Sequence, residues 1–266
     1  ELWDLGFNRL SLGIQDFNEE VQKSVNRMQS TDEVQALVDA ARNAGFGSIS
    51  FDLIYGLPHQ TVESFDATLN TVIDMKPDRL AVYNYAHLPQ RFKGQRMINA
   101  DDIPAPETKL DLLHHTIDKL CDVGYVYIGM DHFALPDDDL VLARENGTLQ
   151  RNFQGYSTHR QCDLVALGVS GIGGIGNMYA QNSVSTIEYE DMIERGELPI
   201  KKGLLVDDDD LVRAAVIQDL MCYDRLDFDK FGADHGINFR EYFADEVEQL
   251  DVLEKDGLIE LSDEGI

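Results

Sequence analysis

The chain has 266 residues, 43% of them hydrophobic, which is enough for a substantial core. Its 22 Lys and Arg against 49 Asp and Glu give a formal net charge of −27. This charge argues against a nucleic-acid-binding surface and against an anionic membrane face. The three cysteines, Cys121, Cys162 and Cys222, are too widely spaced for a disulfide framework or a zinc site. With no signal peptide and no transmembrane run, a reducing, cytoplasmic setting is expected.

The first part of the chain alternates strands and helices at the spacing of βαβ units. Strands are predicted at 9–15, from 48 to the turn at Gly56, and at 79–85. Helices are predicted at 19–27, from 31 to Gly45, and at 62–75. Such alternation predicts parallel strands joined by right-handed crossovers.

Asp52 interrupts the second of these strands, which is apolar enough for burial on both faces. A carboxylate in a buried strand is costly unless something binds it. Gly56 and Pro58 end the strand, so Asp52 lies toward its carboxyl end, where ligands bind in parallel α/β folds. A structural carboxylate bonded to backbone N–H groups is the alternative, and ligand contact is favoured.

A long loop is predicted from Ala86 to about Pro106, and it is locally basic in an acidic chain. An anion-binding loop and an ordinary solvated surface loop both remain open. A helix at 107–123, a strand at 125–128, an irregular stretch at 129–134 and a short helix at 137–146 are expected to follow.

The later part of the chain is expected to be less regular and then helical. A strand is predicted at 163–167, followed by a Gly-rich loop at 168–176, which alone is weak evidence for a ligand site. Helices at 207–222 and 239–255, with a short terminal strand, indicate a small winged-helix-like unit.

Both ends look like interior points of a longer protein. Residues 1–7 are typical of the last turn of a helix with Gly6 as its C-cap. Residues 256–265 indicate a turn, a short strand and a second turn, after which a returning strand is expected. We therefore expect the chain to be a fragment.

Several long segments resemble one known family. They are Arg9–Phe17, Val25–Arg27, Phe51–Pro58, Tyr83–Pro89, Gly129–Ala134 and Asn152–Ser157. In order and spacing they resemble the oxygen-independent coproporphyrinogen III oxidases, which are radical S-adenosylmethionine (SAM) enzymes of haem biosynthesis. The likeness extends from near Arg9 to the end of the chain.

This resemblance implies an α/β fold: a partial parallel (β/α) barrel of radical SAM type, lacking its N-terminal units, and a small helical, winged-helix-like C-terminal domain. The implied domains are 1–185 and 186–266. The implied reaction is oxidative decarboxylation of two propionates of coproporphyrinogen III to vinyl groups, giving protoporphyrinogen IX, by 5′-deoxyadenosyl radical chemistry.

The resemblance also implies cofactors and partners. Two SAM molecules and a [4Fe-4S] cluster held by a Cys-x3-Cys-x2-Cys loop are expected, and this sequence lacks that loop. The cluster cysteines are therefore expected upstream of Glu1, and the chain alone is expected to be inactive. The other expected partners are the porphyrinogen, an electron donor and an electron acceptor, and a monomer is expected.

Five positions match SAM-binding positions of the family: Gln15, Arg27, Asp52, Ala86 and Ile172. An amide at a strand end can bond the SAM amino acid or ribose, a guanidinium can grip its carboxylate, and a carboxylate can accept from ribose hydroxyls. Without the resemblance, Gln15 would be a strand-end polar cap, and Arg27 would be a surface residue or a residue that interacts with the dipole at a helix C-terminus. Ala86 and Ile172 would be ordinary loop or core residues.

Residues that could bind the substrate are less sharply indicated. His132, Arg91 and Arg96 are candidates because the porphyrinogen carries four carboxylates, and Arg9 and Arg160 are further candidates. Histidine can also carry or donate a proton near neutral pH, although a structural role is at least as common.

Two other functions remain open. A haem chaperone of the same superfamily shares the early strands, but residues 152–158 follow the oxidase pattern. Without family knowledge, an ordinary barrel enzyme could use Asp52 and His132 as acid and base.

Overall fold

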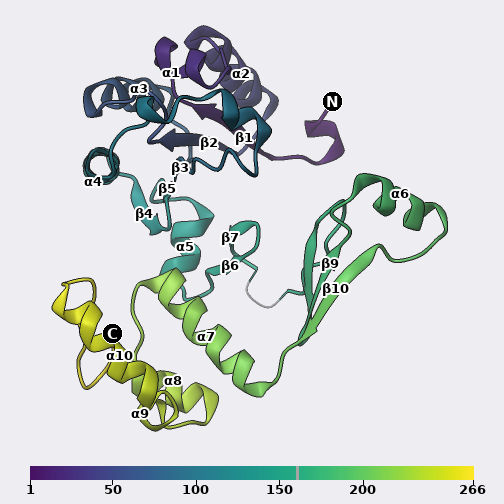
Figure 1. The fold of residues 1–266 in the computed structure, drawn as a ribbon, viewed down its shortest axis with the longest axis vertical. Coiled ribbons are helices and arrows are strands. Elements are labelled where there is room, and N and C mark those ends of the chain that lie inside the picture. The colour runs from purple at the N-terminus through teal and green to yellow at the C-terminus, as the bar shows by residue number, and fades with distance from the viewer. Residues whose placement is uncertain (160–161) are drawn as a thin grey trace. The chain divides into compact units, whose positions relative to one another are not determined.

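The structure is a computed structural model that describes residues 1–159 and 162–266 (Figure 1). The chain divides into two compact units, residues 1–145 and 146–266. The domain boundary after residue 185 stays a prediction.

The first unit contains a five-stranded sheet in the order β1-β2-β3-β5-β4. Its strands are β1 (Arg9–Gln15), β2 (Ser48–Tyr55), β3 (Arg79–Asn84), β4 (Val126–Gly129) and β5 (His132–Ala134). Strands β1, β2 and β3 pair in parallel, as the alternating pattern predicts. Strand β5 runs antiparallel to both of its neighbours.

The helices of this unit begin and end at local signals in the sequence. They are α1 (Glu19–Ser24), α2 (Thr31–Ala44), α3 (Val62–Met75), α4 (Pro106–Asp122) and α5 (Asp139–Glu145). Reciprocal capping boxes start α2 at Ser30 and α3 at Thr61. Gly45 ends α2 with a φ of 99°, which a side chain would disfavour.

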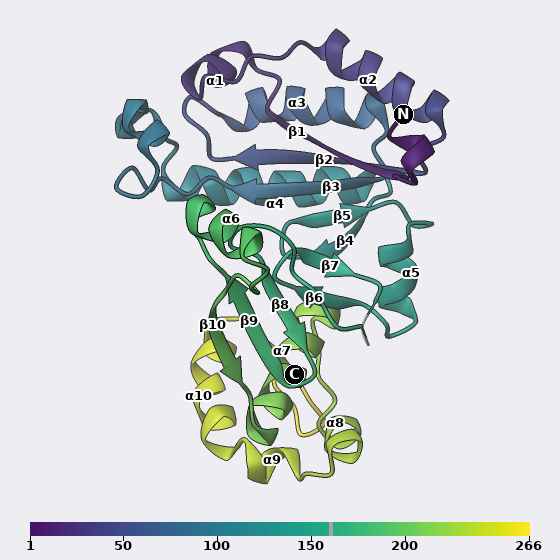
Figure 2. The same cartoon turned by 90° about the vertical axis from the view of Figure 1, so that its right-hand side faces the viewer.

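The core lies between the parallel strands and the helices that join them. Figure 2 shows β1, β2 and β3 side by side in front of α3 and α4. Along β2 buried and half-buried residues alternate, and the buried ones pack against apolar side chains of α2, α3 and α4. The predicted burial of β2 on both faces is therefore wrong: one face carries the core, and Asp52 lies on the other.

The stretch 129–134 is a hairpin rather than irregular. Met130 and Asp131 turn the chain with φ values of 40° and 72°, and β5 pairs back with β4. The long loop contains the short 3-10 helices η2 (Lys93–Met97) and η3 (Ala100–Asp102), and residues near the start form η1 (Trp3–Leu5). Gly6 caps η1 in the predicted left-handed conformation.

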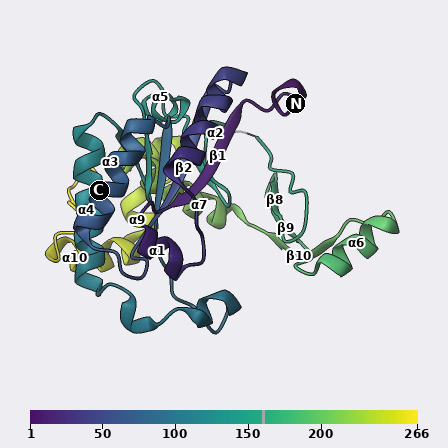
Figure 3. The same ribbon diagram turned by 90° about the horizontal axis from the view of Figure 1, so that it is seen from above.

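The second unit begins with two small antiparallel sheets. Its strands are β6 (Gln150–Asn152), β7 (Gly155–Ser157), β8 (Ile172–Ile175), β9 (Met178–Asn182) and β10 (Ile200–Leu205). Helix α6 (Thr186–Glu194) connects β9 to β10 and lies at the far end of these two strands (Figures 1 and 3).

Two predictions in this part are wrong. Residues 163–167 form no strand, and only Leu164 makes an isolated bridge, to Gly174. The apolar side chains of Val165 and Leu167 are exposed, so the apolar pattern there does not mark a buried strand. The predicted Gly-rich loop contains β8, and the missing side chain at Gly173 leaves room for the Leu164 carbonyl oxygen, which would lie 2.8 Å from an added Cβ.

The rest of the second unit is helical. Its helices are α7 (Asp208–Tyr223), α8 (Phe228–His235), α9 (Phe239–Tyr242) and α10 (Ala244–Lys255). Their core is a cluster of phenylalanines with Leu226. The single helix predicted at 239–255 is interrupted at Phe243, whose ring is buried in that cluster. The predicted terminal strand is absent from the described residues, where Gly265 instead bridges Asp227.

Within the described ranges, none of the helices has the length and apolar character needed to cross a membrane.

Candidate functional site

The face of the sheet that lies away from the helices carries a row of small and polar residues. In the strand register Gly13 is opposite Asp52, Asp52 is opposite Ala81, and Ala81 is opposite His132. Neighbouring strands share side-chain direction at paired positions, so these residues point to the same face. Ala81 lies between Asp52 and His132 in this row, and because it and Gly13 are small, no large side chain stands between the Asp52 and His132 side chains.

Gln15 and Arg27 converge on Gly13 at the carboxyl end of β1. An Arg27 guanidinium nitrogen donates to the Gly13 carbonyl oxygen at 2.8 Å. A Cβ added to Gly13 would lie 2.8 Å from the Gln15 Nε2 atom and 2.9 Å from an Arg27 terminal nitrogen. The two side chains therefore occupy the space above this glycine.

The backbone is unusual at Gln15 and at the residue before Arg27. Gln15 has a φ of 66°, and the pairing of β1 with β2 shifts register between Gly13 and Gln15. Asn26, just before Arg27, has a φ of 52°. Left-handed conformations are costly for residues other than glycine and cluster at functional sites.

Asp52 is half-buried and accepts a hydrogen bond from the Ser11 hydroxyl at 3.2 Å. Burial raises the pKa of Asp52 above its ordinary value. The Ser11 hydrogen bond and the electrostatic effects of His132 and Arg27 act against that rise in pKa. Arg27 and His132 are thus each within electrostatic reach of Asp52.

His132 reaches this face from β5. Its Nδ1 atom donates to the Met130 carbonyl oxygen at 2.8 Å, and its ring lies edge-on to Tyr83 with centroids 5.9 Å apart. Asp52 and His132 are two strand spacings apart, a separation of about 10 Å between backbones. A ligand lying across this face could contact both side chains.

The loop after β3 contains three further candidates, Ala86, Arg91 and Arg96. The Ala86 carbonyl oxygen accepts from Gln95 Nε2 at 2.9 Å. Arg96 is exposed and donates to the Pro89 carbonyl oxygen at 3.0 Å, and exposed Arg91 lies 5.5 Å from the Phe92 ring centroid. The structure places Ala86 just past the carboxyl end of β3, and leaves both guanidinium groups on the loop surface.

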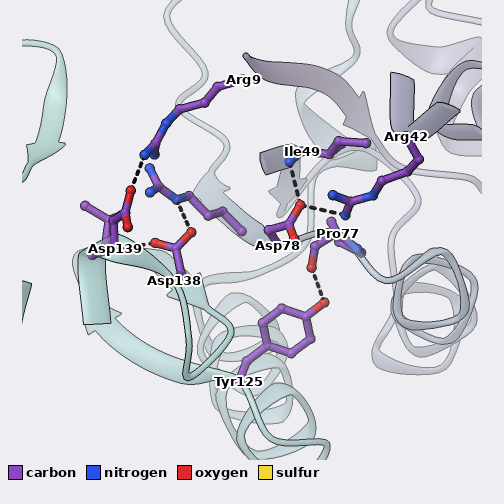
Figure 4. A network of polar contacts seen from close by, with 10 residues as sticks. Arg9, Arg42, Ile49, Pro77, Asp78, Tyr125, Asp138 and Asp139 are labelled. Atoms are coloured by element: carbon purple, nitrogen blue, oxygen red, sulfur yellow. Dashed lines mark hydrogen bonds and ion pairs between the residues drawn. The ribbon is translucent and has the colours of Figure 1, made fainter. Parts of the chain in front are cut away.

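Arg9 is not brought to this site. It begins β1, about 20 Å along the strand from Gln15, and forms an ion pair with Asp139 (Figure 4). Around it, Arg79 pairs with Asp138, and Asp78 accepts from Arg42 and from the backbone of Ile49. A cavity of about 380 Å³ lies at this end, lined by Trp3, Arg9 and these acidic residues among others.

The two remaining candidates lie elsewhere in the chain. Ile172 belongs to the second unit, half-buried on β8 opposite Gln181. Arg160 falls outside the described residues.

The arrangement around Gly13 fits SAM. It offers a guanidinium for a carboxylate, an amide for a polar substituent and a carboxylate for hydroxyl groups, above a position where a Cβ would intrude. An iron–sulfur cluster does not fit the described residues. They contain no group of three or more His, Cys, Asp or Glu side chains that could hold a metal ion.

Sequence reasoning missed three contributors to this site: Gly13, Ser11 and Tyr83. A glycine inside a strand can mark a close approach, and this was the available signal for Gly13. The contacts of Ser11 and Tyr83 depend on strand register, which the sequence pattern did not specify.

Two protein-family models match the chain. The Radical SAM superfamily model matches residues 1–72, and the HemN C-terminal domain model matches residues 206–266. The chain is also similar to proteins named oxygen-independent coproporphyrinogen III oxidase. The Pseudomonas aeruginosa protein is 55% identical over 265 residues, which is 100% of this chain and 58% of that protein. The Thermostichus vulcanus protein is 42% identical over 258 residues, which is 97% of this chain and 79% of that protein.

A solved structure, described as coproporphyrinogen III oxidase (HemN) from Escherichia coli, a radical SAM enzyme, matches with a TM-score of 0.95. It is 47% identical, and the match covers 99% of this chain and 61% of that one. The chain spans about 58% of the length of the first of these relatives.

Proposed function

Because the chain belongs to the oxygen-independent coproporphyrinogen III oxidase family of radical SAM proteins, we propose that it forms the SAM-binding and substrate-binding part of such an oxidase. The proposed reaction converts two propionates of coproporphyrinogen III to vinyl groups. Protoporphyrinogen IX and carbon dioxide are the products. Membership of the radical SAM family implies that the protein uses SAM and a [4Fe-4S] cluster.

The convergence of Gln15 and Arg27 above Gly13, beside Asp52, supports this proposal most directly. These three side chains come from separate segments of the chain, and each is of a type that can bind a polar or charged group of SAM. Arg27 would bind the SAM carboxylate, Gln15 its amino acid or ribose, and Asp52 the ribose hydroxyls. Ala86 would add a backbone contact, and Ile172, in the second unit, stays a candidate for an apolar contact with SAM.

Once bound, SAM would supply 5′-deoxyadenosyl radical chemistry, and the chain's residues would orient the reactants. Asp52 and His132 face the same side of the sheet, so a substrate that contacts His132 would lie close to the SAM site. His132 would bind a propionate or hold a proton at its ring. Arg91 and Arg96, on the loop after β3, would neutralise other propionates if that loop closes on the substrate.

The cluster needs a ligand set that the described residues lack, so we place it on cysteines upstream of Glu1. An electron donor, an electron acceptor, a second SAM, a cytoplasmic location and a monomeric state complete the proposal. The 266 residues alone are then expected to be inactive.

The test uses the whole natural protein, purified without oxygen and supplied with SAM, a reductant, an electron acceptor and coproporphyrinogen III. Formation of both protoporphyrinogen and 5′-deoxyadenosine is the expected result. Arg27→Ala and Asp52→Ala should each lower turnover by about 100-fold at limiting SAM. Arg195→Ala is the matched control, because Arg195 is exposed and pairs with Glu197 on the second unit.

Cleavage of SAM without change in the porphyrinogen would contradict the proposed substrate. Tight binding of haem without decarboxylation would favour a haem chaperone instead. Full activity in Arg27→Ala and Asp52→Ala would contradict the site assignment.

A further inference from the structure

Gln15 and Arg27 have to be held in place although Gln15 itself, and Asn26 just before Arg27, adopt costly left-handed backbone conformations. Apolar packing does not explain this, since both are incompletely buried and end in polar groups. The buried polar residues directly beneath them explain it better.

Asp16 follows Gln15 and is only 1% exposed. Its Oδ1 atom accepts from the Asn18 backbone N–H at 2.6 Å and from the Thr68 hydroxyl at 2.7 Å, and its Oδ2 atom accepts from Gln60 Nε2 at 2.5 Å. Burial raises the pKa of Asp16, and these hydrogen bonds act against the rise. A buried carboxylate with this many donors fixes its own backbone closely.

Gln60 connects Asp16 to the turn that follows β2. It is 3% exposed, its Oε1 atom accepts from the Leu57 backbone N–H at 3.0 Å, and its Nε2 atom also donates to the Ile54 carbonyl oxygen at 2.9 Å. The carboxyl ends of β1 and β2 are therefore joined by side-chain hydrogen bonds beyond the last paired residues.

Gln22 connects the same point to the segment that carries Arg27. Its Nε2 atom donates to the carbonyl oxygens of Asp16 at 2.8 Å and of Gln29 at 3.0 Å, and the Arg27 backbone N–H donates to the Gln22 carbonyl oxygen at 2.9 Å. Gln29 in turn donates to the Ile14 carbonyl oxygen at 2.6 Å. Gln22 and Gln29, which lie before and after Arg27 in the sequence, thus hydrogen-bond the backbone of Asp16 and Ile14, the two neighbours of Gln15.

We propose that Asp16, Gln22, Gln60 and Thr68, called here the Asp16 cluster, are positioning residues that hold Gln15 and Arg27 in the geometry that binds SAM. The ligand identity in this inference rests on the proposed function. The cluster itself lies beneath the site and is nearly closed to solvent, so its members act through Gln15 and Arg27. A cluster that served stability alone would change unfolding without changing the affinity of the folded protein for SAM.

Thr68 offers the cleanest test, because Asp16→Asn could prevent folding by placing amide hydrogens against other donors. Thr68→Val removes the hydroxyl that donates to Asp16 and accepts from the Phe17 N–H, and Thr68→Ser keeps it. Thr116→Val is the matched control. Thr116 is equally buried on α4, but among the described residues its hydroxyl donates to the Leu112 carbonyl oxygen of its own helix alone.

Two measurements on the whole natural protein decide the matter. The first is the dissociation constant of S-adenosylhomocysteine, a probe that cannot react. Thr68→Val should weaken it about 10-fold, Thr68→Ser by less than about threefold, and Thr116→Val not at all. The second is amide hydrogen exchange, in which Thr68→Val should speed exchange of the backbone N–H groups around Gln15 and Arg27 together.

Thr68→Val with unchanged affinity and unchanged exchange around Arg27 would overturn the proposal. Equal weakening by Thr68→Val and Thr116→Val would also overturn it, since the effect would then be general. If the unsubstituted protein fails to bind the probe, the proposed function fails. The exchange comparison then decides separately whether the cluster orders the two segments.

Discussion

Gly13 leaves the space in which Gln15 and Arg27 meet, and this makes it the most economical single residue to test. Its φ is not in the left-handed range, so Gly13→Ala is compatible with the strand backbone. The added Cβ would press on the ends of two flexible side chains at 2.8 and 2.9 Å. We expect SAM binding to weaken about 10-fold or more, while the unfolding free energy changes by less than about 1 kcal/mol.

Calorimetric titration with S-adenosylhomocysteine and urea unfolding check this pair of outcomes. Gly47→Ala is a suitable control, because nothing lies within 4 Å of its added Cβ. Unweakened binding in Gly13→Ala would mean that Gln15 and Arg27 do not act from above this glycine.

The raised pKa of Asp52 predicts a pH dependence of SAM binding. Burial shifts the pKa upward from 3.8, so protonation begins at a higher pH than for an exposed aspartate. If the ionised carboxylate accepts hydrogen bonds from the ribose hydroxyls, affinity should fall as the pH is lowered through that raised pKa. Asp52→Asn should bind more weakly at neutral pH and should lose this part of the pH dependence, as measured by titration between pH 4 and 8. An unchanged pH profile in Asp52→Asn would contradict this role.

The sequence indicated individual site residues better than it indicated the contacts between them. Asp52 stood out because a carboxylate interrupts an apolar strand, and the structure places it on the open face. The meeting of Gln15 with Arg27 could not be predicted, because it depends on two left-handed residues that are not glycine. The burial of Asp16 could not be predicted either, because the residue type alone does not distinguish a buried aspartate from an exposed one.

At the scale of elements, Asp66 joins α3 to α4. It accepts a hydrogen bond from His115 Nε2 at 2.6 Å and forms an ion pair with Lys119. The hydrogen bond from Lys119, more than any other contact, lowers the pKa of Asp66. A lowered pKa stabilises the fold above the unfolded value of 3.8, and this stability is lost as the pH falls through the folded pKa.

Asp66→Asn should therefore lower the unfolding free energy by about 1 kcal/mol at pH 7, and by less at pH 3. Urea unfolding at both pH values measures this. Asp74→Asn, an exposed position on the same helix, should change it by less than about 0.5 kcal/mol. A loss that is as large at pH 3 as at pH 7 would show that the carboxylate charge is not responsible.

Elements with strong local signals were predicted well. Strand β1 and helix α3 have the predicted bounds, because a clear apolar pattern coincides with capping residues and turns. Strand β5 was missed because three residues after a left-handed turn are too short for a periodic pattern. The sheet of β8, β9 and β10 was missed because glycines and exposed residues form much of it, and its strands are specified by pairing.

For the whole molecule, the dominant feature is a net charge of −27. Repulsion among so many carboxylates opposes the compact state, and salt screens it within a Debye length of about 10 Å at 0.1 M. The melting temperature should therefore rise by roughly 3 °C or more between 0.02 and 0.5 M sodium chloride, which is about 1 kcal/mol. Scanning calorimetry checks this, and a melting temperature that falls with added salt would show that attractive ion pairs outweigh the repulsion.

The central step of the proposed function is hydrogen transfer from a propionate side chain of coproporphyrinogen III to a nucleoside derived from SAM, with Arg27, Gln15 and Asp52 as the proposed SAM-binding residues. The most direct measurement gives the whole natural protein a porphyrinogen deuterated on its propionate side chains and examines the 5′-deoxyadenosine by mass spectrometry. We expect deuterium in that product, formed together with a vinyl group, and loss of both in Arg27→Ala. Unlabelled 5′-deoxyadenosine with intact propionates would contradict it.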